Sequence, residues 1–156
     1  MEKRFTRLIF PILFLTLTVS WSAPPCPASD SIHWLSHTDG MAKGDARHQK
    51  RLLFFTAEWC SYCGKMSRET FTSPAVVNYI NAHYIPIKVD YDRDRQTADI
   101  YSVRMLPDTW FVAEDGEQIS HRLGFISADK LLPLLQYVAT DNYKKMSFSK
   151  FLKQCR

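Results

Sequence analysis

The amino-acid sequence predicts an α/β fold in which helices cover both faces of a central mixed β-sheet. A short apolar run at residues 51–56 has the composition of a strand that is buried on both faces. A helix-like segment separates it from a second strand-like segment at residues 84–89, and this order is typical of a parallel pair. Two further segments flank the Asp115-Gly116 turn and predict an antiparallel hairpin.

The first helices are predicted from apolar spacing and from helix breakers. Residues 32–50 are weakly helical, because Gly40 and Gly44 lower the helix propensity of this segment. From residue 60 to about residue 81, apolar residues recur at helical spacing, and Pro74 is expected to kink or divide this helix.

The second half of the chain is predicted to hold a short helix, the hairpin and a last helix. The short helix is expected at residues 97–102, and the hairpin strands at residues 109–113 and 118–123. Ser127 is a candidate N-cap for the last helix. Pro133 lies early in that helix and is expected to remove one backbone hydrogen bond.

The first 22 residues have the order of a secretory signal peptide, with basic residues, an apolar run at residues 8–19 and then small residues. This run is interrupted by Pro11 and is shorter than the roughly 20 apolar residues that a spanning helix needs. We therefore expect cleavage after residue 22 and no stable membrane insertion. Residues 23–31 are predicted to form a leader and residues 32–156 the domain, in the periplasm or secreted.

The charge pattern is not that of a nucleic-acid-binding protein. The formal net charge of +4 falls to +2 when residues 1–22 are removed, and the remaining basic residues are spread along the chain. A solvated surface of mixed charge is expected.

Cys60 and Cys63 are separated by Ser61 and Tyr62 at the point where a predicted buried strand turns into a predicted helix. At a helix N-terminus, unpaired backbone N–H groups and the helix dipole favour a thiolate, which is the form that attacks disulfides. Cys60 is therefore the candidate nucleophile. Cys63 lies one turn further along the helix and is the candidate resolving thiol, which expels a partner from a mixed disulfide.

Two structural roles for this cysteine pair are alternatives. A zinc site needs a second pair of cysteine or histidine ligands at matching spacing, whereas the five histidines are isolated, so no metal site is predicted. An inert structural disulfide would close a very short loop and would therefore add little stability.

Residues 52–63, Leu-Leu-Phe-Phe-Thr-Ala-Glu-Trp-Cys-Ser-Tyr-Cys, resemble the active-site strand and turn of the thioredoxin family. Residues 101–109, Tyr-Ser-Val-Arg-Met-Leu-Pro-Asp-Thr, are similar to the family segment that ends in a cis-proline. The resemblance covers about residues 32–139. Residues 66–76 are in addition similar to the stretch after the cysteines in small exported thioredoxin-like proteins and in the periplasmic C-terminal domain of the membrane thiol:disulfide interchange reductase.

This resemblance implies a thioredoxin-like fold and a protein-disulfide oxidoreductase without a cofactor. Pro107 is expected to be cis and, with Leu106, to lie against the cysteine pair. Trp59 and Tyr62 are expected to form an apolar contact surface around the sulfur, with plain packing as the alternative. The implied partners are proteins with disulfides and, as electron donor, a membrane thiol transporter.

The chain departs from the family pattern at two positions. Thioredoxins place a buried aspartate six residues before the first cysteine, where this chain has Phe54, so the expected proton acceptor for Cys63 is missing. Glu58 is the candidate replacement, acting through water, with a solvated surface glutamate as the alternative. Asp108 replaces the usual threonine after the proline, and its charge is expected to oppose ionisation of the nucleophile.

Cys26 and Cys155 stand near the two ends of the mature chain. In an oxidising compartment a bond between them would persist and could add on the order of a few kcal/mol of stability. Free or intermolecular thiols are the alternatives, because sequence does not set connectivity.

Together these observations predict an exported protein thiol:disulfide oxidoreductase that acts as a reductant. Ser61-Tyr62 supplies no cation to stabilise the thiolate, and such stabilisation is what makes a cysteine pair strongly oxidising. The alternatives are a non-catalytic thioredoxin-like interaction module and a carrier of copper or zinc.

Overall fold

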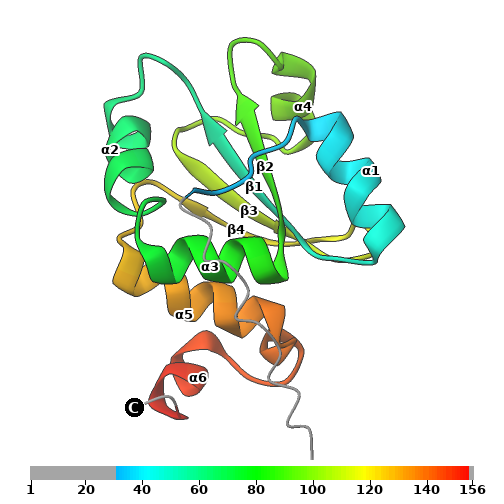
Figure 1. Cartoon of the computed structure of the whole chain (residues 1–156), viewed down its shortest axis with the longest axis vertical. Coiled ribbons are helices and arrows are strands. Elements are labelled where there is room, and N and C mark those ends of the chain that lie inside the picture. The colour runs from blue at the N-terminus through cyan, green and yellow to red at the C-terminus, as the bar shows by residue number, and fades with distance from the viewer. Residues whose placement is uncertain (1–30, 155–156) are drawn as a thin grey trace, which may run out of the picture.

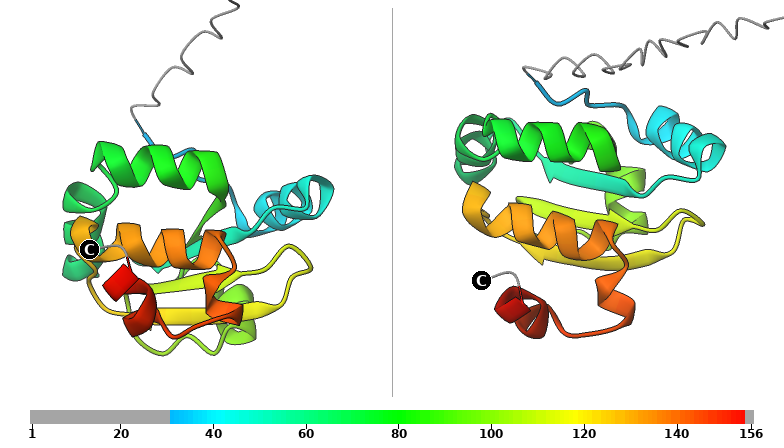
Figure 2. Two further views of the ribbon diagram at one scale, coloured as in Figure 1. Left: turned by 90° about the horizontal axis from the view of Figure 1, so that it is seen from below. Right: turned by 60° about the horizontal axis from the view of Figure 1, so that its bottom comes forward.

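The computed structural model describes residues 31–154 of the 156-residue chain. The predicted signal peptide lies outside the described residues, as do Cys26, Cys155 and all of the predicted leader except Ser31. Figures 1 and 2 show a central sheet with helices on both sides. Within residues 31–154, no helix has the length and apolar character needed to cross a bilayer.

Four strands form a mixed sheet in the order β2-β1-β3-β4. β1 (Arg51–Thr56) pairs in parallel with β2 (Ile85–Asp90) and antiparallel with β3 (Asp108–Val112), which pairs antiparallel with β4 (Gln118–Leu123). All of β1 is buried, as its continuous apolar run predicts. Gly116 has a φ of 90° in the β3–β4 turn, a conformation that glycine adopts without steric strain. The predicted mixed sheet is confirmed.

The helix predicted from residue 60 is divided into two helices. α2 (Ser61–Glu69) ends before Thr70, and α3 (Pro74–His83) begins at Pro74. Proline suits the first turn of a helix, because its missing N–H group would have no partner there. The break keeps α2 short and leaves the cysteine pair at its start.

Helices cover the two faces of the sheet separately. α3 and α5 (Ala128–Ala139) lie side by side on one face, and α1 (His37–Arg47) and α4 (Arg95–Ile100) lie on the other (Figures 1 and 2). α5 continues through Pro133 without ending. The core under α3 and α5 is the larger of the two, and it includes both cysteines of the pair.

The chain before α1 lies along the outer edge of β2, where Leu35 forms a parallel bridge with Ile87. Only part of the predicted weak helix is therefore helical. Gly40 and Gly44 lie where α1 packs on the sheet, since a Cβ atom would collide with Ile87 or with the Arg51 guanidinium respectively. Close packing accounts for both glycines, at the expense of helix propensity.

Two buried cations stand at the start of β1. Lys50 pairs with Glu114 at 2.5 Å and with Asp141 at 3.2 Å, and Arg51 pairs with Asp45. Burial alone would lower the pKa of Lys50, but the two carboxylates outweigh it and raise that pKa. These pairs join α1, β1 and the β3–β4 turn at the end of β1 opposite to the cysteine pair.

Two short helices, η1 (Asn142–Lys144) and α6 (Phe148–Gln154), follow the last helix that the sequence predicts. α6 lies on the outer side of α5 (Figures 1 and 2). The ring of Tyr137 contacts Phe148 and Phe151, with centroids 5.2 and 5.4 Å apart. A helix of two turns is too short for apolar periodicity to reveal it.

Candidate redox site

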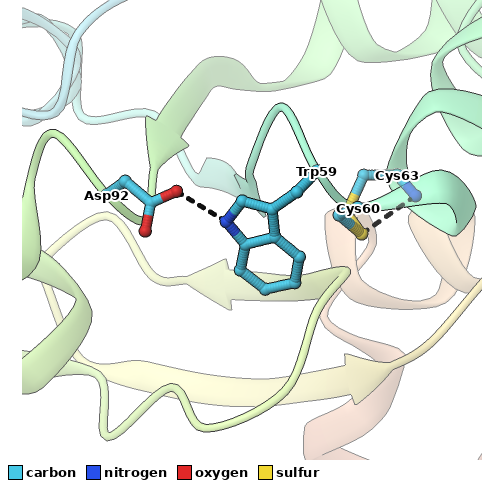
Figure 3. Close-up of a disulfide and its surroundings, with 4 residues drawn as sticks. All are labelled: Trp59, Cys60, Cys63 and Asp92. Carbon is cyan, nitrogen blue, oxygen red and sulfur yellow. Dashed lines mark hydrogen bonds between the residues drawn. A yellow bond between two sulfur atoms is a disulfide. The ribbon is translucent and has the colours of Figure 1, made fainter.

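Cys60 and Cys63 form a disulfide at the start of α2, with their sulfur atoms 2.03 Å apart (Figure 3). Cys60 is the N-cap residue of α2, and its Sγ accepts a hydrogen bond from the backbone N–H of Cys63 at 3.2 Å. The first N–H groups of a helix have no partner within the helix. They therefore favour negative charge on Cys60 once the disulfide is reduced.

The two cysteines differ in accessibility. Cys60 is 8% exposed and Cys63 is 1% exposed. Cys63 is packed in the large core together with Met66 of the same helix. A partner protein can approach Cys60 more readily than Cys63, and this difference suits the roles predicted for an attacking and a resolving thiol.

Leu106 and Pro107 lie at the same end of the sheet as the cysteine pair. Because β1 and β3 are antiparallel and Phe55 is opposite Asp108, the residues just before β3 lie beside the residues just after β1. The Leu106–Pro107 peptide bond is cis.

Large apolar side chains are exposed at or near this end of the sheet. Trp59 and Tyr62 flank Cys60 in the chain and are 67% and 62% exposed, and Met105 precedes Leu106 and is 61% exposed. Aromatic residues and methionine are enriched in protein interfaces. Met105 was not predicted as a contact residue, although its place two residues before Pro107 was a usable signal.

The loop after β2 holds Trp59 in place. The Asp92 carboxylate accepts a hydrogen bond from the Trp59 indole N–H at 2.6 Å (Figure 3). In the same loop, Arg93 pairs with Glu58 at 2.9 Å. Asp92 lies 33 residues from Trp59 in the chain and belongs to no motif, so the sequence did not single it out.

The carboxylate of Glu58 lies in solvent, with 81% of the side chain exposed. Its ion pair with Arg93 is also exposed, and such pairs contribute only about 0–1 kcal/mol to stability. This position corresponds to the surface alternative considered for Glu58. Its part in proton transfer stays a prediction.

A groove of about 520 Å³ reaches Cys60 from the side of the chain that precedes α1. Its walls include the N-cap residue Cys60 and Gly64 of α2. The segment before α1 contributes Trp34, and β2 contributes Lys88 and Asp90. The walls carry both signs of charge. Within residues 31–154, no group of three or more histidine, cysteine or acidic side chains is placed to hold a metal ion.

Phe54 fills the position at which thioredoxins carry a buried aspartate. It is fully buried and belongs to the same core cluster as the cysteine pair. Its ring centroid lies 4.8 Å from that of Phe71, which in turn lies 5.1 Å from that of Trp34. An aromatic cluster therefore replaces the carboxylate, and apolar surroundings disfavour ionisation of a buried thiol.

Asp108 does not face the cysteine pair. Its buried carboxylate accepts a hydrogen bond from the Trp110 indole at 2.8 Å and lies 3.0 Å from Nδ1 of His121, and Trp110 packs in the core on the other face of the sheet. Burial raises the pKa of Asp108, while the contacts with Trp110 and His121 oppose this rise. Its side chain therefore lies on the face of the sheet away from the core that holds Cys60. The expectation that its charge opposes ionisation of Cys60 is not supported.

The pairing of Asp108 with His121 predicts a pH-dependent stability. His121→Phe keeps a ring stacked on Trp110 but removes the ring nitrogen, so the pKa of the Asp108 carboxyl should rise further. A carboxyl whose pKa is higher in the folded than in the unfolded protein stabilises the fold at pH values below the unfolded-state pKa. This stabilisation is lost as the pH rises through the folded-state pKa. The variant should match wild type near about pH 3 and be about 1–3 kcal/mol less stable by about pH 6.

Urea unfolding across this pH range measures the difference in free energy between the two proteins. The double variant Asp108→Asn with His121→Phe has no carboxyl at this site and should show no such trend. A difference between His121→Phe and wild type that stays constant over the whole range would contradict the prediction.

Residues 37–139 match the family model described as a thioredoxin-like domain. The disulfide bond reductase DsbH of Chlamydia pneumoniae is 24% identical in an alignment of 110 positions that covers 63% of this chain and 66% of that protein. The chain therefore spans just under two thirds of DsbH. A thioredoxin of Chlamydia trachomatis serovar D is 29% identical over 84 residues, which are 54% of this chain and 78% of that protein.

Solved structures show the same fold. A thioredoxin from Thermus thermophilus superposes with a TM-score of 0.65 at 23% identity, covering 71% of this chain and 89% of its own. A DsbH oxidoreductase superposes with a TM-score of 0.62 at 20% identity, covering 77% of this chain and 91% of its own. The reduced C-terminal domain of DsbD from Neisseria meningitidis superposes with a TM-score of 0.56 at 23% identity, covering 64% of this chain and 90% of its own. The chain belongs to the thioredoxin-like family, with its cysteine pair at the start of α2.

Proposed function

We propose that this chain is an exported protein thiol:disulfide oxidoreductase that reduces disulfides in other proteins. The observation that carries this proposal is the Cys60–Cys63 disulfide at the start of α2, with Cys60 the more accessible cysteine. The name of the similar DsbH protein, a disulfide bond reductase, supports the reducing direction. The order of residues 1–22 supports export to the periplasm or the medium.

The proposed reaction has two exchange steps. In the reduced protein, the Cys60 thiolate attacks one sulfur of a substrate disulfide, and the other substrate sulfur leaves as a thiolate and takes up a proton. Cys63 then loses its proton and attacks Cys60 Sγ, which expels the second substrate thiol. The substrate gains two electrons, the cysteine pair loses two, and the disulfide of the structure is restored.

The protein around the pair has two tasks in these steps. The N-terminal N–H groups of α2, including that of Cys63, stabilise the attacking Cys60 thiolate of the first step. Trp59, Tyr62 and Met105 offer an apolar contact surface for the partner chain beside its disulfide. A membrane thiol transporter is the proposed source of electrons for the next cycle.

Trapping of mixed disulfides tests this proposal. In the Cys63→Ala variant the second step is blocked, so partner proteins should accumulate on Cys60 to near stoichiometric amounts. Mass spectrometry of non-reduced complexes from the periplasm or the medium identifies the attached chains and the linking cysteine.

The Cys60→Ala variant is the control for this experiment and should trap no partner. A non-catalytic interaction module with structural cysteines would trap none with either variant. That result would refute the proposed activity.

A further inference from the structure

Thr109 carries a buried hydroxyl that makes no hydrogen bond. Its side chain is fully buried, and its Oγ1 atom has neither a hydrogen-bond partner nor contact with solvent. Such a group destabilises the protein, because its bonds to water are lost on folding and are not replaced. An unpaired buried group in a native protein therefore calls for a specific explanation, and a redox role is one such explanation.

The strand register places this hydroxyl on the cysteine side of the sheet. Thr109 of β3 is directly opposite Phe54 of β1, and side chains that are directly opposite share a face. Phe54 belongs to the core cluster that contains Cys60 and Cys63. Thr109 thus brings a polar atom next to the position where the family's buried carboxylate is missing.

Two other buried hydroxyls in this core have partners. Thr70 donates a hydrogen bond to the carbonyl of Ile126 at 2.6 Å, and Tyr84 donates one to the carbonyl of Leu135 at 2.7 Å. Among residues 31–154, Thr109 Oγ1 is the one side-chain hydroxyl oxygen that has neither contact with solvent nor a hydrogen-bond partner.

We infer that the Thr109 hydroxyl is a positioning group for the resolving thiol: it is unpaired in the disulfide form and hydrogen-bonds to Cys63 Sγ after reduction. The inference rests on the proposed redox cycle of the pair. Reduction breaks the bond that holds the sulfurs 2.03 Å apart, so Cys63 Sγ is free to move. It then carries either an S–H group that donates or a thiolate that accepts, and a rotating hydroxyl can serve both.

A group with a partner only in the reduced state shifts the redox equilibrium. Thr109→Val keeps the shape of the side chain and removes the hydroxyl. The disulfide form then no longer buries an unpaired hydroxyl, and the reduced form loses its hydrogen bond to Cys63. Both effects favour the disulfide. A hydroxyl that stays unpaired in both states would instead leave the equilibrium unchanged.

The experiment equilibrates the full-length mature protein with a dithiothreitol buffer. Two electrons and two protons pass from the dithiol to the Cys60–Cys63 disulfide, and the two dithiothreitol sulfurs form the new disulfide. Alkylation of the free thiols, followed by mass spectrometry of the peptide that carries Cys60 and Cys63, measures the reduced fraction of this pair. We expect Thr109→Val to shift the equilibrium constant toward the protein disulfide by about 3- to 10-fold, the equivalent of one net hydrogen bond.

Thr70→Val is the matched control, because Thr70 is equally buried but its hydroxyl already has a partner. This variant should lower stability in both redox states and leave the equilibrium unchanged. Urea unfolding should show that Thr109→Val is more stable than wild type when oxidised and is not when reduced. Should valine prevent folding at position 109, Thr109→Ser and Thr109→Ala form a second pair, in which only alanine should shift the equilibrium.

An equilibrium constant that is the same for wild type and Thr109→Val would overturn the inference, as would equal stabilisation of both redox states. The measurement needs a reversible disulfide but no turnover of a protein substrate. Failure of the proposed reductase activity would therefore appear in mixed-disulfide trapping, and failure of the Thr109 inference would appear in the equilibrium.

Discussion

Replacing Cys60 with serine is expected to lower disulfide reductase activity by at least about a thousand-fold, because a serine hydroxyl stays protonated and does not attack a disulfide. Reduction of insulin, with dithiothreitol as the electron source, measures this loss. Cys63→Ser is the matched variant, since it keeps the first attack and should stop at the mixed disulfide after one encounter.

The fold should survive the Cys60→Ser change. The disulfide joins residues only three positions apart, so the chain-entropy model assigns it about 2 kcal/mol. Circular dichroism and urea unfolding of the variant should therefore show a folded protein of somewhat lower stability. Insulin reduction within about ten-fold of wild type by a folded Cys60→Ser protein would contradict the assignment of the nucleophile.

Phe54→Asp is expected to produce the largest loss of stability. Phe54 is fully buried, and its ring packs 4.8 Å from that of Phe71. Removing a buried phenylalanine side chain costs about 3–5 kcal/mol, and the new carboxyl adds the penalty of burying a polar group. Urea unfolding should show a total loss of more than about 4 kcal/mol.

The same variant tests whether proton transfer limits resolution. If Cys63 lacks a proton acceptor, Phe54→Asp should speed its attack on a preformed mixed disulfide in the molecules that remain folded. Phe54→Asn is the matched control, since it has the same size as aspartate but cannot accept the proton. Stopped-flow measurement from about pH 6 to about pH 9 brackets the ordinary thiol pKa of ~8.5.

Glu58→Gln completes this series. It should slow resolution further if Glu58 carries protons through water, although its carboxylate lies in solvent beside Arg93. Equal rates for wild type, Phe54→Asp, Phe54→Asn and Glu58→Gln at every pH would show that proton transfer is not limiting.

The central strand and the redox pair could both be predicted from the sequence, because their signals are local. β1 has the predicted bounds, since a continuous apolar run is what burial on both faces requires. Cys60 and Cys63 follow directly in the chain, so their place at a helix start depends only on where that strand ends. Pro74 divides the predicted long helix, because a proline at its first position suits a new helix.

The surroundings of the pair depend on contacts between distant segments. Asp92 reaches Trp59 across 33 residues, and Trp34 joins Phe71 from the chain that lies along the edge of β2. Neither residue belongs to a motif, so neither could be found before the strands were placed side by side. α6 was missed for a related reason, because its place on α5 follows from a few aromatic contacts.

Amino-acid order alone determined that this chain forms a mixed sheet with a Cys-Xaa-Xaa-Cys pair at a helix start. Tertiary structure decided what each polar group near that pair can do. Asp108 and Thr109 are neighbours in the chain, yet their side chains lie on opposite faces of the sheet. The Asp108 carboxylate pairs with His121 on one face, and the Thr109 hydroxyl lies on the other face, which packs against the core that holds the cysteine pair. Successive side chains of a strand point to opposite faces, so the register of β3 against β1 assigned them to different environments.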